Sequence, residues 1–390
     1  MHKILTLNQI SVVGLERLPR EHYEIASEFT HPEAILLRSH KLQSQDIAES
    51  VLGIARAGAG VNNIPVDACT ERGIPVFNTP GANANAVKEL IIAALCLGSR
   101  GILQGVQYVD TLKDMTDKAE MNALLEKEKK NYKGNELAGK TLGVVGLGAI
   151  GSMVADAALE LGMRVKGYDP ALSVASAWRL PSSVERIENL NSLFSKCDYI
   201  TLHLPVLDAT RGLINRELLA SCKKDLRLLN FARAEIVDTA AVISALNDGD
   251  LGQYIADFPE PGLIGVPNTI LTPHIGASTD EAEDNCAVMA ADQIKDFIEN
   301  GNIKNSVNFP SIAMERAGSP RLAIANRNVP KMLGTILSLL ADEDINVVDM
   351  INKSRDDIAY NLIDVAQVPS DEVLKKILDV EGVITVRVLK

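Results

Sequence analysis

Three side chains in this sequence could together move a proton beside an anionic substrate. Arg233, Glu260 and His274 each come shortly after a predicted strand. A carboxylate can orient a histidine and stabilise its charged form, so that the histidine exchanges a proton near neutral pH. An arginine can hold a carboxylate through two parallel hydrogen bonds. Singly, each residue could be structural or part of a surface ion pair, but the three together favour acid–base chemistry.

A glycine-rich turn upstream predicts a binding site for a dinucleotide. Residues 140–151 place Gly146, Gly148 and Gly151 in the spacing G-x-G-x-x-G between a predicted strand and a predicted helix. The three glycines serve a tight turn, close approach of a pyrophosphate and close packing of helix on strand. The next predicted strand ends in Asp169, and a carboxylate there accepts from ribose hydroxyls and repels a 2′-phosphate. The pattern favours NAD over NADP, the alternative being an ordinary βαβ unit with a glycine turn.

The composition predicts a globular protein, since 46% of the 390 residues are hydrophobic and 23% are charged. The net charge of −12 argues against a nucleic-acid binder, which needs a basic surface. The five cysteines lack C-x-x-C spacing, so we expect no disulfide framework and no metal site. The N-terminus lacks the apolar run of a signal peptide, and no apolar run is long enough to span a bilayer. We therefore expect a cytoplasmic protein with no membrane partner.

The elements that must position these residues alternate between strands and helices, which predicts parallel sheets. The first part has apolar strand candidates at residues 3–10, 34–38, 52–56 and 74–77. The second part has six, enough for a doubly wound sheet, at residues 142–145, 164–168, 198–202, 226–230, 253–256 and 269–272. In such sheets ligands bind beyond the carboxyl ends of the strands, which is where the three side chains above are expected.

The segments around these sheets have simpler interpretations. The polar residues 111–135 predict a solvated helix or loop. Residues 280–300 predict a long helix that ends at Asn300-Gly301. Residues 303–320 are polar and contain two prolines, which predicts a linker. Beyond it, the order strand–helix–strand–strand–helix–strand predicts a ferredoxin-like α+β unit.

The chain resembles the D-isomer-specific 2-hydroxyacid dehydrogenases, in which these motifs occur in the same order. The shared motifs are the glycine turn with Asp169, Asn230-x-x-Arg233…Asp238, Asp257…Glu260-Pro261 and Thr272-Pro-His274-Ile-Gly-Ala277. Residues 56–63 and 78–90 resemble the branch of this family that acts on D-3-phosphoglycerate. The C-terminal unit resembles the ACT domain that many of these enzymes carry as a serine sensor.

The resemblance implies a role for each motif residue. Arg233 would hold the substrate carboxylate and the C2 oxygen, His274 would take the hydroxyl proton, and Glu260 would orient His274. The segment from Asp257 to Glu260 is shorter than the family pattern, so either carboxylate could support the histidine. We favour Glu260 because Pro261 follows it as the pattern requires, and we expect Asp257 to face the nicotinamide carboxamide.

The resemblance also implies binding residues around the reacting groups. Besides the glycines, Asp169 and Asp257, the cofactor would contact Ala149, Ile150, His203, Pro205, Ala232 and Gly276. The substrate would contact Arg38, Arg56, Ala57, Gly58, Ala59 and Gly60. A dianionic phosphate in an acidic protein needs such fixed cations, although Arg38 could equally be an ordinary surface arginine.

The ACT-like unit departs from the family's serine site at two positions. Asn328 and Asn346 match the asparagines that hold serine, and an amide can both donate to a carboxylate and accept from an ammonium. Asn326 stands where a histidine is common, and Lys331 replaces a glycine that lets the ligand approach the backbone. L-serine is therefore a possible effector, and a unit that only dimerises is the alternative.

We expect an α/β enzyme of three domains. A flavodoxin-like substrate domain takes residues 1–99 and 281–318, a Rossmann-type NAD-binding domain takes residues 100–280, and the ferredoxin-like ACT domain takes residues 319–390. The active site is predicted in the cleft between the first two domains, closing by a hinge.

The reaction implied is NAD-dependent oxidation of D-3-phosphoglycerate to 3-phosphohydroxypyruvate, the first step of L-serine biosynthesis, in a homodimer or homotetramer. The alternatives are a glyoxylate or hydroxypyruvate reductase of the same family and, from another class, an NAD-sensing binding protein.

Overall fold

The computed structural model describes residues 1–178 and 180–389, which divide into two compact units. Unit 1 comprises Met1–Asn83 together with the chain from Asp280 onward, and unit 2 comprises Ala84–Thr279. The helix α3 (Ala84–Ser99), which the predicted three-domain division assigns to the substrate domain, groups with unit 2. Its buried Val87, Ile91 and Leu95 pack in the core of that unit.

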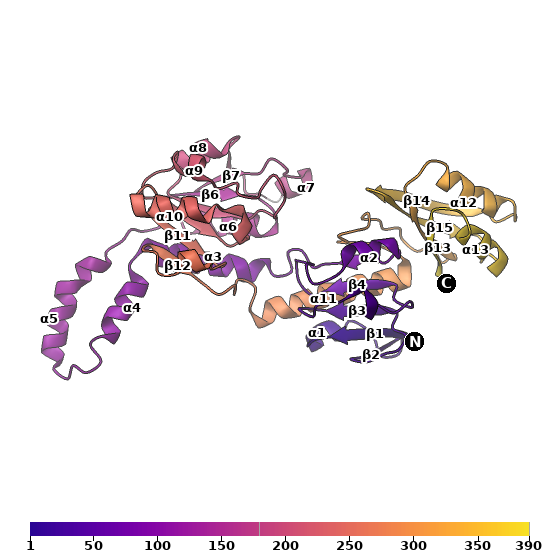
Figure 1. Ribbon diagram of the computed structural model, residues 1–390, viewed down its shortest axis with the longest axis horizontal. Helices are drawn as coiled ribbons and strands as arrows, with labels where there is room; N and C mark the ends of the chain where they lie inside the picture. The colour runs from indigo at the N-terminus through magenta and orange to yellow at the C-terminus, as the bar shows by residue number, and fades with distance from the viewer. Residues whose placement is uncertain (179, 390) are drawn as a thin grey trace. The chain divides into compact units, whose positions relative to one another are not determined.

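Unit 1 begins with a five-stranded parallel sheet in the order β2-β1-β3-β4-β5 (Figure 1). This is the flavodoxin-like order that the sequence predicts. Its strands are β1 (His2–Leu7), β2 (Tyr23–Ala26), β3 (Ala34–Leu37), β4 (Gly53–Arg56) and β5 (Val76–Phe77). Its helices are α1 (Val12–Leu15), α2 (Val66–Glu71) and the long α11 (Asp280–Asn300).

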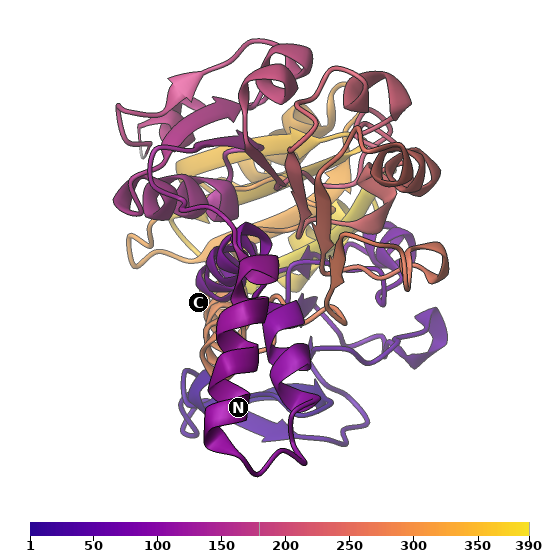
Figure 2. The ribbon, with the colours of Figure 1, turned by 90° about the vertical axis from the view of Figure 1, so that its left-hand side faces the viewer.

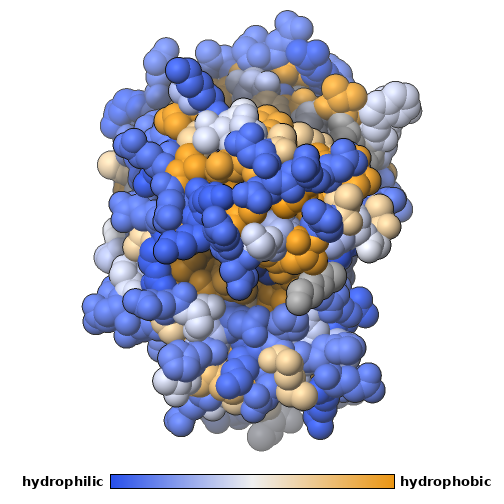
Figure 3. Space-filling view, turned by 90° about the vertical axis from the view of Figure 1, so that its right-hand side faces the viewer, coloured by the Kyte–Doolittle hydropathy of each residue, from blue (hydrophilic) through white to orange (hydrophobic). Residues whose placement is uncertain are grey.

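The end of the chain adds a four-stranded antiparallel sheet to unit 1, in the order β14-β15-β13-β16. The order of elements confirms the ferredoxin-like prediction: β13 (Arg321–Arg327), α12 (Met332–Ala341), β14 (Val347–Arg355), β15 (Ile358–Val365), α13 (Asp371–Leu378) and β16 (Val383–Leu389). Leu337 and Leu339 of α12 are only partly buried. The face of the molecule shown in Figure 3 has hydrophobic patches among hydrophilic side chains.

The antiparallel sheet shares one core with the N-terminal sheet. Tyr360, Leu362 and Leu389 cluster with Phe297 of α11 and with residues of β1 and β3. The segment predicted as a linker takes part in this core, because Ile303, Phe309 and Ile312 are buried. The segment is polar on average, but these three large apolar side chains point inward.

A buried ion pair fastens the same junction. The Arg321 guanidinium, fully buried, donates to both carboxylate oxygens of Asp364 at 2.6 and 3.0 Å. It also donates to the carbonyls of Asn300, Met314 and Glu315. One side chain thereby holds the end of α11, the connecting segment and β15, and each of its charged hydrogen bonds offsets part of the cost of its burial.

Unit 2 contains a seven-stranded parallel sheet in the order β12-β11-β10-β9-β6-β7-β8 (Figure 1). Read from β8, this is the doubly wound dinucleotide-binding order, extended by one strand. The strands are β6 (Thr141–Val145), β7 (Arg164–Tyr168), β8 (Glu185–Arg186), β9 (Tyr199–Leu202), β10 (Arg227–Asn230), β11 (Gln253–Ala256) and β12 (Thr269–Leu271).

Helices cover the faces of this sheet, and its central strands are apolar runs because both faces are buried. These helices are α6 (Ala149–Glu160), α7 (Val174–Ala177), α8 (Leu190–Lys196), α9 (Arg216–Leu219) and α10 (Thr239–Asp248). Two more, α4 (Ile102–Asp110) and α5 (Lys118–Glu128), form a pair that projects from the unit (Figures 1 and 2). Neither has a fully buried residue, and α5 lies within residues 111–135, where the sequence predicts a solvated helix or loop.

No helix among the described residues is both long and apolar enough to cross a membrane.

Candidate active site

The glycine turn after β6 has the geometry that a dinucleotide requires. Gly146 has φ = 90°, and a Cβ there would stand 2.4 Å from the carbonyl oxygen of His203. A Cβ at Gly151 would stand 2.0 Å from the carbonyl oxygen of Gly146, so neither position admits another residue. A Cβ at Gly148 would have no atom within 4 Å. The turn therefore leaves open space at Gly148, beside Ala149 and Ile150 in the first turn of α6, where a pyrophosphate can approach the backbone.

Asp169 lies at the end of β7, beside this turn. Its carboxylate accepts hydrogen bonds from the backbone N–H groups of Leu147 and Ala171, both at 2.9 Å. A hollow of about 630 Å³ opens next to it, within the usual size of ligand pockets. The hollow has largely apolar walls, which suit a flat base, and they include Leu147, Leu172, Val174, Trp178, Leu180 and Val184. Arg186 also lines the hollow, and its positive charge would attract a 2′-phosphate. Selection against NADP would therefore depend on the Asp169 carboxylate.

His203 follows β9 and packs against the glycine turn. Its Nε2 lies 3.0 Å from the hydroxyl of Thr201, and its Cδ2 would lie 3.3 Å from a Cβ at Gly151. Its Nδ1 is buried and has no hydrogen-bond partner among the described residues. Burial lowers the pKa of His203 to about 3, so the ring is neutral at working pH and suited to a neutral hydrogen bond. The orphaned nitrogen and the open space at Gly148 both fit a bound dinucleotide.

Asp257 anchors the turn that carries His274. This carboxylate is 2% exposed and accepts from the Thr272 hydroxyl at 2.6 Å. It also accepts from the backbone N–H groups of Ile275 at 2.8 Å and Gly276 at 2.7 Å. Because the two backbone donors directly follow His274, the carboxylate fixes the backbone at the histidine itself.

His274 is exposed and has a left-handed backbone, with φ = 56°. A residue other than glycine rarely adopts this conformation unless its surroundings impose it, and such positions cluster at functional sites. Here the hydrogen bonds of Asp257 impose it. The ring centroid of His274 lies 4.6 Å from that of Phe258, at an interplanar angle of 50°.

Phe258 also brings Arg233 to the same place. The guanidinium carbon of Arg233 lies 5.6 Å from the Phe258 ring centroid, and its Nη1 donates to the Ala232 carbonyl at 2.7 Å. The buried Asn230 donates to the Arg233 carbonyl at 2.9 Å and so shapes the bend after β10. The structure thus places a cation and an imidazole on one aromatic ring.

Glu260 has a different partner from the one expected. Its carboxylate accepts a hydrogen bond from the hydroxyl of Thr239 at the start of α10. Within the described part of the chain, no hydrogen bond joins Glu260 to His274. The role of Glu260 as the residue that orients His274 therefore stays a prediction, and Asp257 is the carboxylate that positions the histidine's backbone.

The sequence did not single out Phe258, Thr239, Thr272 or Asn230 for these contacts. Phe258 and Asn230 stand inside the motifs quoted for Arg233 and Glu260, so the motifs contained them without revealing their contacts. Pro205 stands two positions past His203 on the exposed loop after β9.

In unit 1, two arginines follow neighbouring parallel strands. Arg38 comes after β3 and pairs with Glu283 of α11 at 2.5 Å. Arg56 ends β4, donates to the Arg38 carbonyl at 2.8 Å and also donates to the Gly60 carbonyl. The loop of Ala57, Gly58, Ala59 and Gly60 is tied down by the Asn78 side chain, which donates to the Ala59 carbonyl at 2.6 Å. A half-buried cation is thus held against a loop with small side chains.

The asparagines predicted to bind serine are not equivalent in the structure. Asn326 is 2% exposed, accepts from Asn361 at 2.7 Å and donates to the Arg327 carbonyl at 2.6 Å. Its amide is therefore engaged inside the sheet, whereas Asn328 and Asn346 are nearer the surface. Lys331 has φ = 76°, which explains why α12 begins at Met332 and not earlier. A glycine at Lys331 would adopt this backbone without strain.

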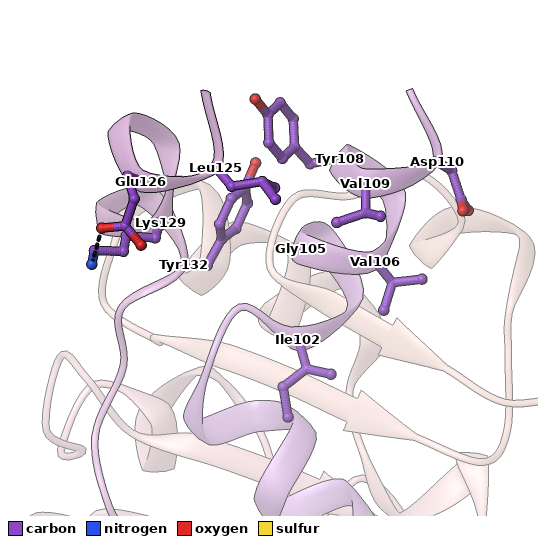
Figure 4. Close-up of a pocket in the computed structure, with 10 residues that line it drawn as sticks. All are labelled: Ile102, Gly105, Val106, Tyr108, Val109, Asp110, Leu125, Glu126, Lys129 and Tyr132. Carbon is purple, nitrogen blue, oxygen red and sulfur yellow. Dashed lines mark hydrogen bonds and ion pairs between the residues drawn. The ribbon is translucent and has the colours of Figure 1, made fainter. Parts of the chain in front are cut away.

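A separate hollow between α4 and α5 lacks the groups for catalysis (Figure 4). It is lined mainly by Ile102, Val106, Val109, Leu125 and the rings of Tyr108 and Tyr132. The charged groups on it are Asp110 and the pair of Lys129 with Glu126 at the rim. This hollow supplies neither a nucleophile nor an acid–base pair, so the strand ends of the seven-stranded sheet are the candidate site.

Comparison with known proteins identifies the family. Residues 102–276 match the profile described as D-isomer specific 2-hydroxyacid dehydrogenase, NAD binding domain. The chain is 32% identical over 369 residues to D-3-phosphoglycerate dehydrogenase of Haemophilus influenzae, covering 90% of this chain and 85% of that protein. It is 35% identical to the enzyme of that name from Methanocaldococcus jannaschii, covering 84% of this chain but only 61% of that longer relative.

A solved structure agrees with these matches. The 3-phosphoglycerate dehydrogenase of Entamoeba histolytica with bound NAD⁺ superposes with a TM-score of 0.61 at 29% identity, over 79% of this chain and 98% of that one. The chain belongs to the D-isomer-specific 2-hydroxyacid dehydrogenase family. Its cofactor is NAD, as the glycine turn and Asp169 predicted.

Proposed function

We propose that the protein is an NAD-dependent 2-hydroxyacid dehydrogenase that oxidises D-3-phosphoglycerate to 3-phosphohydroxypyruvate, the first step of L-serine biosynthesis. The observation that carries the acid–base part is the pairing of Arg233 and His274 on the ring of Phe258. The names of the Haemophilus and Methanocaldococcus relatives support the substrate. Arg38 and Arg56 support it as well, because they supply fixed cations for a phosphate in a chain of net charge −12.

In this mechanism each residue acts at a stated atom. The Arg233 guanidinium binds the substrate carboxylate and the oxygen on C2 through parallel hydrogen bonds. The His274 imidazole removes the proton of the C2 hydroxyl as general base. Bound NAD supplies the hydride acceptor, so that a hydroxyacid becomes an oxoacid and one proton is released. Asp257 holds the His274 turn through the backbone N–H groups of Ile275 and Gly276, and Glu260 would orient the His274 ring.

The substrate is tested by following NADH formation at alkaline pH with D-3-phosphoglycerate, and with D-glycerate and D-lactate in parallel. Alkaline pH favours the oxidation because it releases a proton. Turnover confined to the phosphorylated acid is the expected result. Turnover on the unphosphorylated acids alone would replace the proposal with a reductase of the same family. No turnover on any acid, with NAD still bound, would favour a binding protein that senses NAD.

Two further parts of the proposal concern regulation and assembly. L-serine is proposed as an effector of the ACT-like unit through Asn328 and Asn346, and a ligand that binds only the folded protein raises its melting temperature. A thermal shift with L-serine, absent with D-serine, is expected. The homodimer or homotetramer is checked by light scattering of the purified protein.

A further inference from the structure

A small cavity in unit 1 lies at the seam between the two sheets, away from the residues assigned above. It has a volume of about 90 Å³, several times the roughly 10–15 Å³ that one water needs. Its walls come from four places in the fold: the residues before β4, the turn between α2 and β5, the helix α11 and the strands of the C-terminal sheet. The polar groups among them are Arg72, Arg387, Thr385, Tyr360 and Glu49.

Arg387 on β16 is the group that this cavity leaves unsatisfied. Its guanidinium carbon lies 4.6 Å from the ring centroid of Phe297, and its Nη2 donates to the Ile298 carbonyl at 3.1 Å. Its Nη1 is buried and has no hydrogen-bond partner among the described residues. A buried donor without a partner is costly, and a buried charge without a counter-charge is more so.

The second arginine is oriented by the backbone. Arg72 follows α2 and donates to the carbonyls of Ile47 at 2.9 Å and Ala48 at 2.7 Å. These bonds fix the plane of its guanidinium but bring no negative charge. The two arginines thus contribute two positive charges to one small space, and an arginine keeps its charge even when it is buried.

The acidic groups nearby do not neutralise this pair. Glu49 lines the cavity but is exposed, and no ion pair among the described residues joins it to Arg72 or Arg387. Burial lowers the pKa of Arg387, and the charge of Glu33, whose carboxylate is bonded to His2 at 2.7 Å, does not reverse this. The Tyr360 hydroxyl donates to the Gly301 carbonyl at 3.0 Å and is neutral, because burial raises its pKa to about 12.

We propose that this cavity is a binding site for a small oxyanion, held by Arg387 and Arg72 with the Thr385 hydroxyl as a further donor. Phosphate, sulfate and the carboxylate of a small metabolite share the required chemistry, because a guanidinium fork matches their paired oxygens. The cavity is too small for a dinucleotide. Since its walls come from the C-terminal sheet and from loops and a helix around the N-terminal sheet, a bound oxyanion would fasten the C-terminal sheet to the rest of unit 1. This proposal stands independently of the substrate proposed above.

The first test is the melting temperature of the full chain with phosphate, sulfate or acetate, each against chloride at equal ionic strength. A ligand that binds only the folded state raises the melting temperature, by about 2–4 °C for each kcal/mol of binding in a unit of this size. Arg38 and Arg56 could also bind phosphate and raise the melting temperature. The informative quantity is therefore the oxyanion-induced rise in melting temperature of the wild type minus that of Arg387→Met. Arg387→Met keeps an apolar stem against Phe297, and the exposed Arg20→Met serves as the matched control.

The expected result is an oxyanion-specific rise in wild type and Arg20→Met that is largely lost in Arg387→Met. Thr385→Val, which has nearly the same shape, should weaken the rise without unfolding the protein, and it decides the matter if Arg387→Met does not fold. The relative size of the phosphate, sulfate and acetate responses distinguishes a phosphate-type ligand from a carboxylate. Equal rises in all four proteins would overturn the proposal.

The second test locates the ion directly. Crystals of the full chain grown with selenate should show an anomalous peak beside Nη1 of Arg387. A cavity that contains only water under these conditions would overturn the proposal. The variants Arg387→Met and Thr385→Val could remove the selenate peak from crystals and still show the same oxyanion-dependent rise in melting temperature as the wild type. That result would mean an adventitious ion only, and it would also overturn the proposal.

Discussion

The five-stranded sheet of unit 1 and the seven-stranded sheet of unit 2 are both parallel and doubly wound, yet different chemistry follows their strands. In the first sheet Arg38 follows β3 and Arg56 ends β4, and the partners of these arginines are a carboxylate and backbone carbonyls. After β7 and β11 come carboxylates, Asp169 and Asp257, whose partners are mainly backbone N–H groups. One sheet therefore presents positive charge, and the other uses negative charge to shape its own loops.

The difference shows how one architecture serves two tasks. In both sheets the carboxyl ends of the strands collect the polar residues, as expected for open α/β sheets. The side chains in the loops, and not the order of the strands, decide whether an edge receives an anion or a cofactor. Changes at the first sheet should therefore alter substrate affinity, and changes at the second should alter turnover or cofactor affinity.

The largest effect is expected for His274→Ala. Loss of the general base should lower kcat by about 10²-fold or more, since proton transfer contributes at least that much. Affinity for NAD should not change, and it can be followed by the fluorescence of Trp178, the only tryptophan, which lines the hollow beside Asp169. His31→Ala, on the surface of unit 1, is the control. Full activity of His274→Ala would remove the histidine from the mechanism.

Asp257→Asn should come next, with a fall in kcat of about tenfold to a hundredfold. The asparagine amide has the size of the carboxylate, but its NH₂ group would face one of the groups that now donate to Asp257. Each hydrogen bond to a charged group contributes about 1.5–3 kcal/mol to stability, so its loss would loosen the turn. The His274 turn should then lose its left-handed backbone, which a crystal structure of the variant would show. If kcat stays at the wild-type value with the turn displaced, the backbone at His274 does not limit catalysis.

Arg38→Met tests the first sheet. The KM for D-3-phosphoglycerate should rise by about tenfold, because a charge-assisted hydrogen bond to phosphate is lost. Binding of NAD and kcat at saturating substrate should stay near the wild-type values. A variant that weakens NAD as strongly as substrate would contradict the division of tasks between the two sheets.

Asp169→Ala should have a smaller effect. The affinity for NAD should fall by about fivefold, because the variant loses roughly one net hydrogen bond to the cofactor. Discrimination against NADP should relax, because the carboxylate no longer repels a 2′-phosphate. Titration of Trp178 fluorescence with each dinucleotide measures both. Unchanged preference would assign cofactor choice to another residue of the hollow.

The last prediction concerns the pH dependence of stability and leaves catalysis aside. His203 stays neutral in the folded protein because burial lowers its pKa to about 3, whereas in the unfolded chain it titrates near 6.5. Between these values only the unfolded state binds the proton, so stability falls as pH falls, by about 1.4 kcal/mol per pH unit from this group. Urea unfolding of His203→Gln between pH 6.5 and 4.5 should show a shallower decline than the wild type. Identical slopes would show that His203 is protonated in the native state.

The sequence predicts most of the fold because its central strands are buried on both faces. Apolar runs mark β6, β9, β10 and β11 within a residue of their observed ends. The strands β2 and β8 escaped prediction, since both are short and neither is a continuous apolar run. The two residues of β8, Glu185 and Arg186, are polar and exposed, so no periodicity reveals them.

The candidate site is predictable in its residue types but not in its contacts. The motifs identify Arg233, Asp257 and His274, and the comparisons confirm the family and NAD. No pattern in the sequence indicates that Asp257 fixes the His274 backbone or that Glu260 bonds to Thr239. These contacts depend on loop geometry and side-chain rotamers, which neighbours far along the chain determine.

The shared core of the two sheets in unit 1 bears on how the protein can be dissected. Residues 303–318 look like a natural place to shorten the chain, yet Tyr360, Leu362 and Leu389 lie in the same core as Phe297. A truncation before β13 would expose that apolar surface and leave the carbonyls of Asn300 and Met314 without the Arg321 guanidinium. Such a fragment is expected to aggregate, so an inactive truncated form would report lost solubility and not a lost regulatory signal.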